Sequence, residues 1–254
     1  MKPTVRLTQV ADTIELSPHL KRIVLSGEGL IGFPTGKEGA HVKVILPSEG
    51  EEIPNLDIRG SHRPVMRSYT IREYDQETNR LSLDFVINRH KGPATDWAAK
   101  AKKGDYLGIA GPGPMKLTDF NAESYLLVGD LTSVNAINGY ALAVSSQSAV
   151  EAVISVPTKE DIIALDVGTN VSVHWVIDKE DEANSLSEAI MAIADKLPAN
   201  TEVFLGLEAR NVRTLKGLLQ EEVGIHRQNI TVTGYWKKGV DADRFGAQKK
   251  ASPL

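Results

Sequence analysis

The sequence of 254 residues contains no cysteine. This absence excludes disulfide scaffolds, iron–sulfur clusters and zinc sites with cysteine ligands, and thiol catalysis. Any oxidation–reduction chemistry must therefore be carried by a non-covalently bound organic cofactor.

Long apolar runs are absent as well. No stretch reaches the roughly 18 apolar residues of a membrane span, so none is expected. The first residues, Met1–Arg6, lead directly into strand-like sequence and show no apolar signal core. We therefore expect a cytoplasmic protein without a membrane partner.

Three further kinds of site lack their sequence patterns. The histidines show no metal-ligand spacing, and no metal site is predicted; the five considered are His41, His62, His90, His174 and His226. Ser61 and Ser133 lack the strained turn of a hydrolase nucleophile. A strict glycine-rich dinucleotide fingerprint is also missing after the apolar run Tyr125–Val128.

The net charge of −4 is unevenly distributed. Residues 205–254 hold nine Lys/Arg and five Asp/Glu, whereas the remaining residues hold 20 and 28. A basic final fifth on an acidic chain favours a local anion site over nucleic-acid binding, and no nucleic-acid partner is expected. The alternative, which the charge distribution fits equally well, is a solvated basic surface without a binding role.

The first half of the chain is typical of short strands separated by turns. We expect one helix at about Ala94–Lys102 and a closed antiparallel barrel of six strands. The strands are expected at Val5–Val10, Leu20–Ser26, His41–Leu46, Met66–Tyr74, Leu81–Ile87 and Tyr106–Ala110.

The second half alternates strands and helices, which predicts an α/β domain with a mostly parallel sheet of five strands. The break at Gly111–Pro114 places the boundary, giving domains 1–114 and 115–254. Strands are expected at Tyr125–Val128, Ala149–Val156, Val171–Ile177, Thr201–Leu207 and Ile230–Tyr235, and helices at Ser133–Ser145, Leu186–Lys196 and Asn211–Glu221.

The segment Arg67-Ser68-Tyr69-Thr70 lies within a predicted strand. Residues i and i+2 of a strand point the same way, so Arg67 and Tyr69 share a face. A guanidinium and a phenol about 7 Å apart can reach the phosphate and the aromatic ring of one ligand. An ordinary strand with an exposed arginine fits the same residues.

The turn Gly92-Pro93-Ala94-Thr95 leads into the predicted helix of the first half. Backbone N–H groups at a helix start are unpaired and attract phosphate. The alternative is a plain loop-to-helix junction with Thr95 as the capping residue.

Together with Asp84–Ile87 and Trp97-Ala98, these two segments resemble the siderophore-interacting protein family. Its members are FAD-dependent ferric-siderophore reductases related to the ferredoxin-NADP reductase superfamily. Further matches follow in the family's order from about residue 20 to 240, at His41–Lys43, Gly104-Asp105, Gly111–Gly113, Gly129-Asp130 and Gly234–Gly239. The ordered set carries the resemblance.

The resemblance implies an N-terminal FAD-binding barrel and a C-terminal, ferredoxin-reductase-type domain for NADH, NADPH or ferredoxin. Arg67 would hold the FAD pyrophosphate, Tyr69 would stack on the isoalloxazine, and Thr70 would face the flavin N5, so that Tyr69 and Thr70 are the catalytic candidates. The other implied FAD contacts are Ser68, Val86, Ile87, Asn88, Gly92, Pro93, Ala94, Thr95, Tyr235 and Trp236.

The chain departs from the family pattern in two places. Asn88 stands where the family often has a histidine. The family's Gly-Asp-Glu-Thr-Ala-Leu-Pro-Ala segment reads Gly129-Asp130-Leu131-Thr132-Ser133-Val134-Asn135-Ala136, without the acidic residue and the proline. Glu208 either matches a family glutamate near the second-domain site or is a solvated strand end.

The substrate implied by the resemblance is a ferric siderophore. Clustered cations attract an anionic chelate, and the candidates are Lys43, Arg227, Lys237 and Lys238. The sequence thus predicts a ferric-siderophore reductase. Two alternatives remain open: a general NAD(P)H:flavin or ferredoxin-type oxidoreductase with another acceptor, and a flavin-free siderophore carrier.

Overall fold

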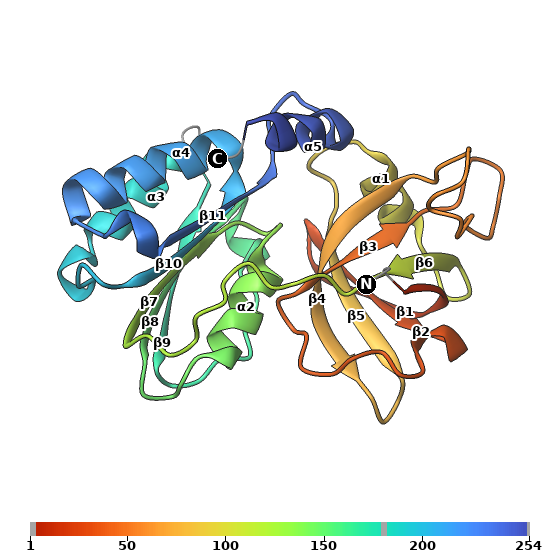
Figure 1. Cartoon of the computed structure of the whole chain (residues 1–254), viewed down its shortest axis with the longest axis horizontal. Helices are drawn as coiled ribbons and strands as arrows, with labels where there is room; N and C mark the ends of the chain where they lie inside the picture. Colours follow the sequence, from red (N-terminus) through yellow and green to blue (C-terminus); the bar gives the residue numbers. More distant parts are fainter. Residues whose placement is uncertain (1–3, 179–181, 253–254) are drawn as a thin grey trace. The chain divides into compact units, whose positions relative to one another are not determined.

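The structure, a computed structural model, describes residues 4–178 and 182–252 of the chain. The chain divides into two compact units, Met1–Met115 and Lys116–Leu254. Figure 1 shows the first unit as a barrel of strands and the second as a sheet with helices.

The first unit is a closed barrel in the order β1-β2-β5-β4-β3-β6 with antiparallel neighbours. A single helix, α1 (Pro93–Lys100), follows β5. The strands are β1 (Val5–Ser17), β2 (Leu20–Ser26), β3 (His41–Ile45), β4 (Met66–Asp75), β5 (Arg80–Val86) and β6 (Tyr106–Ala110).

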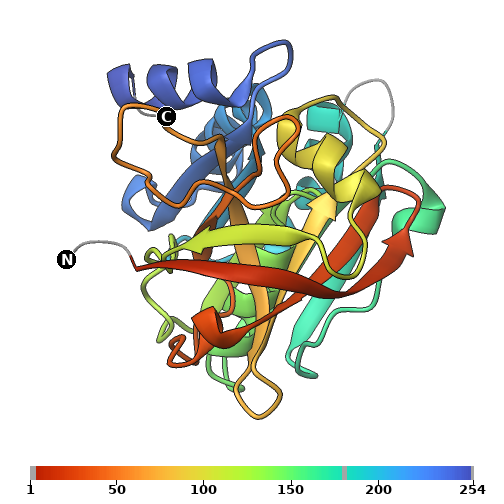
Figure 2. The same ribbon diagram turned by 90° about the vertical axis from the view of Figure 1, so that its right-hand side faces the viewer.

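Strand β1 is longer than the sequence predicts, because it pairs with two neighbouring strands along different parts of its length. Its first residues pair with β6, and from Gln9 onward it pairs with β2 as far as Ser17, with an irregularity between Val10 and Asp12. Figure 2 shows it crossing the barrel as one long strand (red). The prediction of an end at Val10 is wrong, since the ladder with β2 continues the strand to Ser17 and satisfies its backbone hydrogen bonds.

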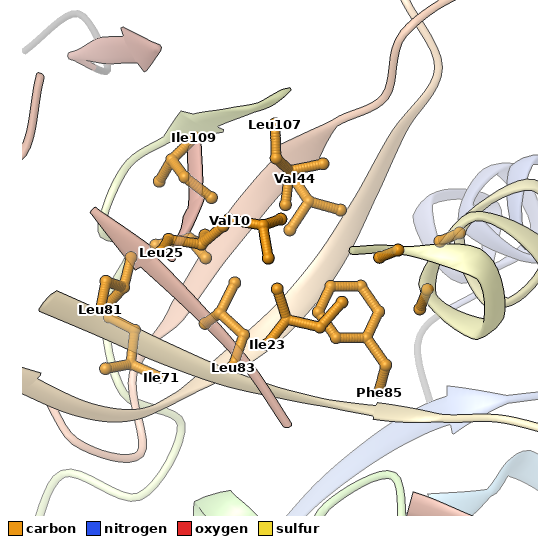
Figure 3. Close-up of a cluster of buried hydrophobic side chains, with 14 of the residues drawn as sticks. Val10, Ile23, Leu25, Val44, Ile71, Leu81, Leu83, Phe85, Leu107 and Ile109 are labelled. Carbon is orange, nitrogen blue, oxygen red and sulfur yellow. The ribbon is translucent and has the colours of Figure 1, made fainter. Parts of the chain in front are cut away.

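The barrel interior is filled by aliphatic side chains from its strands, with Phe85 on the side of α1 (Figure 3). One ion pair joins the neighbouring strands β2 and β5. The guanidinium of Arg22 donates to both carboxylate oxygens of Asp84, at 2.7 and 2.9 Å, and the Asp84 side chain is 1% exposed. Arg22 and Asp84 lie directly opposite each other in the β2–β5 ladder, so their ion pair supports the register of these two strands.

The second unit is a five-stranded sheet of order β11-β10-β7-β8-β9 in which all neighbours are parallel. Helices α3 and α4 pack on one face of it and α2 on the other (Figure 1). The elements are β7 (Ser124–Gly129), α2 (Val134–Ala143), β8 (Ala149–Val156), β9 (Val171–Ile177), α3 (Glu182–Met191), β10 (Glu202–Glu208), α4 (Ala209–Leu218), β11 (Ile230–Trp236) and α5 (Ala242–Ala251).

The predicted fold class, an antiparallel barrel followed by a parallel α/β sheet, is confirmed. The helix boundaries differ in detail. The predicted helix Leu186–Lys196 is α3 followed by a separate 3₁₀ turn, and α4 ends in a π-helical turn that stops at Gly224, whose φ is 82°. The sequence missed α5, because its polar composition carries a weak apolar stripe with Phe245 as its buried residue.

The Arg22–Asp84 pair gives a test of what holds the barrel together. Asp84→Ala should lower the free energy of unfolding by about 3 kcal/mol, because it leaves the guanidinium without its buried partner. Replacing both residues, as Arg22→Met with Asp84→Leu, should cost much less. Urea unfolding measures this, with Glu77→Ala at an exposed turn as the control. Equal losses in the single and double variants would contradict the argument.

Candidate functional site

Strand β4 presents Arg67 and Tyr69 on one face. They lie opposite Val44 and Val42 of β3, which are fully buried. Residues directly opposite each other in an antiparallel pair share a face. Arg67 and Tyr69, both half-buried, therefore share the core-side face of the strand, and Arg67 Nη1 donates to the Met66 carbonyl at 2.8 Å.

Ser68 and Thr70 occupy the opposite face of β4. Ser68 is exposed and accepts a hydrogen bond from Lys43 Nζ at 2.7 Å. Thr70 is buried and lies opposite His41. Since consecutive strand residues point to opposite faces, a ligand can reach both Tyr69 and Thr70 only at an open edge of β4.

Such an edge exists, because β4 and β5 do not pair along their full length. Their ladder begins at the Ile71–Leu83 pair and runs toward the hairpin. Before that point, Met66–Thr70 pairs with β3, while the last residues of β5, Asp84–Val86, pair with β2. The part of β4 that carries the predicted FAD contacts therefore has a backbone edge that the β5 ladder does not cover.

An aromatic chain links this edge to helix α1. The rings of Tyr69 and Phe85 have centroids 4.0 Å apart, and Phe85 and Trp97 have centroids 5.9 Å apart. Burial raises the pKa of the Tyr69 phenol, and the charge of Arg67 opposes that shift. The phenol is therefore neutral at physiological pH.

Helix α1 begins at Gly92 as the capping residue, with Pro93 in the first position and no side chain capping the first turn. A Cβ added to Gly92 meets no atom within 4 Å. The backbone N–H groups of this turn are thus open to an anion. The alternative reading of Thr95 as the cap is wrong, since it lies within the first turn and its hydroxyl donates to the Val86 carbonyl at 3.3 Å.

The end of β5 brings the other predicted contacts next to this turn. Val86 and Ile87 are buried, and Asn88 follows them with a left-handed φ of 59°. Asparagine tolerates this conformation better than most residues. The Asn88 amide donates to the Pro18 carbonyl at 3.0 Å, so it anchors the β1–β2 hairpin. We call Arg67–Thr70, Val86–Asn88 and Gly92–Thr95 the barrel site.

A second polar cluster lies at the carboxyl edge of the parallel sheet. The buried carboxylate of Asp130, after β7, accepts hydrogen bonds from Trp236 Nε1 at 2.8 Å and from the Thr132 backbone at 2.7 Å. The ring of Tyr235, next to Trp236, stands nearly perpendicular to that of Phe204, with the ring centroids 6.5 Å apart. The Gly129-Asp130 pair, which matches the family pattern, thus joins β7 to the end of β11.

Glu208 is not a solvated strand end. It is buried and caps α4, accepting from the backbone N–H groups of Arg210 and Asn211 at 2.5 and 3.2 Å. Its other oxygen accepts from the backbone of Lys238 at 3.1 Å. Glu208 therefore fixes the start of α4 and the segment after β11.

The four basic substrate candidates are not brought together as a group. Lys237 and Lys238 follow the carboxyl end of β11, whereas Arg227 precedes its amino end, roughly 20 Å away along a seven-residue strand. Lys237 donates to Gln248 of α5 at 2.9 Å. Lys43 is exposed on the barrel.

Sequence reasoning missed a hydrogen-bonded group at the same sheet edge. Glu182, the first residue of α3, accepts from the Ser155 hydroxyl and, at 2.7 Å, from the Asn211 amide. No sequence motif marks these residues, because they meet only where β8 ends and where α3 and α4 begin. In the part of the chain that the structure describes, no three His, Asp or Glu side chains form a metal-binding group.

Within those same described ranges, no helix has the length and apolar character needed to cross a bilayer.

Comparison with known proteins agrees with this architecture. The ferredoxin reductase of carbazole 1,9a-dioxygenase has the same fold, with a TM-score of 0.70 at 14% identity over 91% of this chain and 67% of that one. The fold is of the ferredoxin-reductase type, with an antiparallel barrel followed by a five-stranded parallel sheet.

The chain belongs to the siderophore-interacting protein family. Residues 9–115 match the profile of the siderophore-interacting FAD-binding domain, and residues 122–239 match that of the siderophore-interacting protein. The ferric vibriobactin reductase ViuB of Vibrio cholerae serotype O1 is 30% identical over 92% of this chain and 90% of its own length. The siderophore-interacting protein SipS from Aeromonas hydrophila is 29% identical, with a TM-score of 0.83 and 98% coverage of both chains.

The capping role of Glu208 can be tested directly. Glu208→Ala should lower the free energy of unfolding by about 1–2 kcal/mol, because α4 loses its N-terminal cap. Glu208→Gln keeps an acceptor oxygen and should cost less. Thermal unfolding measures both, with Glu221→Ala at an exposed position as the control. A Glu208→Ala variant as stable as the parent would show that the cap contributes nothing.

Proposed function

We propose that this protein is an FAD-dependent reductase of ferric siderophores. In this proposal it takes electrons from NADH, NADPH or ferredoxin and releases iron as Fe(II) for cytoplasmic use. The observation that carries the proposal is the open edge of β4 at Met66–Thr70, which lies in the region matching an FAD-binding domain and leads by an aromatic chain to the uncapped helix α1.

The residues of the barrel site fit FAD by their chemistry. The Arg67 guanidinium can donate two hydrogen bonds to a phosphate, and the N–H groups of the α1 first turn offer a second phosphate contact. The neutral Tyr69 ring suits an isoalloxazine, and Thr70 supplies a hydroxyl on the other face of the same open edge. When bound, FAD accepts two electrons from a donor and can release them one at a time.

The second unit is proposed to bind the electron donor. The chain adds β8 and β9 on one side of β7, and β10 and β11 on its other side. The order of the strands therefore switches between β7 and β10. Ligands of open parallel sheets bind beyond the carboxyl ends of the strands at such a switch point. Helix α2 starts there with no side chain capping its first turn. The Asp130–Trp236 hydrogen bond keeps the adjoining loops in place.

The acceptor is proposed to be an anionic ferric chelate. Reduction weakens the hold of hard oxygen ligands on iron, so that the chelate releases Fe(II). No side chain need act as an acid or a base in the electron transfer. Lys43 and Lys238, both exposed, are proposed to attract the chelate by their charge.

The purified protein is expected to contain FAD rather than FMN. Arg67→Ala should weaken FAD binding by about 1.5–3 kcal/mol, because a charge-assisted phosphate contact is lost. Tyr69→Phe keeps the ring and should have a smaller effect. Mass spectrometry of the released cofactor and flavin titration measure both, with Arg80→Ala on the far side of the hairpin as the control. A protein that binds no flavin would support the siderophore-carrier alternative instead.

Reduction of an anionic ferric catecholate should weaken as salt rises, because exposed charges are screened within about 10 Å at 0.1 M salt. A neutral ferric hydroxamate should show little of this dependence. Lys43→Ala with Lys238→Ala should raise the KM for the catecholate while FAD stays bound, and Lys37→Ala should not. Unchanged KM values at low salt for both chelates would remove these lysines from the acceptor site.

A further inference from the structure

His41, the first residue of β3, has a neighbouring segment on each side of its strand. On one side it lies directly opposite Thr70 of β4. On the other side, its carbonyl accepts a hydrogen bond from the backbone of Gly113 at 2.8 Å, shortly after the end of β6. Gly113 belongs to Gly111–Met115, the segment by which the chain leaves the first unit and which we call the exit segment. His41 thus lies between Thr70 and the exit segment.

The exit segment also holds the side chain of His41. Ring atom Nδ1 lies 3.2 Å from the Pro114 carbonyl oxygen, and because a carbonyl can only accept, the ring carries its proton on Nδ1 and donates it there. The ring is also packed against Gly113, where an added Cβ would come 2.5 Å from both Cε1 and Nε2. One hydrogen bond and one close contact therefore fix the orientation of the imidazole.

Thr70 is the residue that this fixed ring can position. Residues directly opposite each other in an antiparallel pair share a face, with Cβ atoms about 4.5–5.5 Å apart, so the two side chains are neighbours. Thr70 is 8% exposed, and no residue that the structure describes hydrogen-bonds to its hydroxyl. Every fully enclosed side-chain oxygen or nitrogen among those residues has a partner, so the Thr70 hydroxyl is partly accessible. Its hydrogen bonds are left for a bound molecule.

We propose that His41 is a positioning residue for Thr70, and that it directs the Thr70 hydroxyl toward the flavin ring of FAD. This inference rests on the proposed function, in which one cofactor meets Tyr69 and Thr70 at the open edge of β4. Threonine is β-branched and occupies few χ1 rotamers, so a rigid ring beside it selects among them. His41 acts through Thr70 and need not touch the cofactor itself.

The test measures the midpoint potential and the visible absorption band of FAD bound to the full-length protein, so it needs neither the electron donor nor the acceptor. His41→Ala removes the ring, and Thr70→Val removes the hydroxyl but keeps the β-branched shape. Both should shift the potential in the same direction, by about tenfold in the equilibrium constant for FAD reduction, which is about 30 mV for two electrons. Both should change the absorption band alike, because each removes the same hydrogen bond.

The combination of the two substitutions separates positioning from a general structural role. Adding His41→Ala to Thr70→Val should shift the potential no further, because the two residues act as one unit. His41→Asn keeps an N–H for the Pro114 carbonyl and should restore most of the parent's potential and spectrum. The matched control His62→Ala removes an exposed histidine of the same unit and should match the parent.

Two results would overturn this inference while the parent binds FAD. The first is a His41→Ala protein with the potential and spectrum of the parent, which would leave His41 the role of holding the exit segment alone. The second is a His41→Ala shift of equal size with and without the Thr70 hydroxyl, which would show that His41 acts independently of Thr70. A parent protein that binds no FAD would overturn the proposed function as well, so the two failures are distinguishable.

Discussion

The point at which β4 and β5 stop pairing governs the rest of the barrel site. Beyond the Ile71–Leu83 pair, β5 stays with β2 and β4 stays with β3. The backbone edge of Met66–Thr70 is thereby left outside the β5 ladder. In the proposed function, this edge is where one cofactor would meet both Tyr69 and Thr70, which point to opposite faces of the strand.

Some helices of this chain have a side chain that caps their first turn, and others have none. Glu208 and Asp241 supply carboxylates to α4 and α5, and these helices need no further anion. Helices α1 and α2 begin without a capping side chain. The open starts lie where the proposed FAD phosphates and the proposed donor would bind, because an unpaired N–H group keeps its affinity for a phosphate only while no carboxylate of the chain occupies it.

Much of the fold could be predicted because its signals are local. Alternating apolar residues and turn residues located the barrel strands, and buried apolar runs located the parallel ones. The errors fell where pairing or polar composition decided: β1 extends to Ser17 through its pairing with β2, and α5 is too polar to show a stripe. Within the site, the resemblance singled out Arg67–Thr70 and Gly92–Thr95, but nothing marked the group formed by Ser155, Glu182 and Asn211.

The sequence by itself determined the order of a barrel and a parallel sheet, the shared face of Arg67 and Tyr69, and the absence of any cysteine chemistry. These follow from composition and from the period of a strand, which need no knowledge of distant neighbours. Only the tertiary structure decided where the β4–β5 ladder begins, and that Glu208 is buried and accepts a hydrogen bond from the backbone of Lys238 after β11. Both depend on contacts between segments far apart in the chain, because register and burial are set by the partner as much as by the residue.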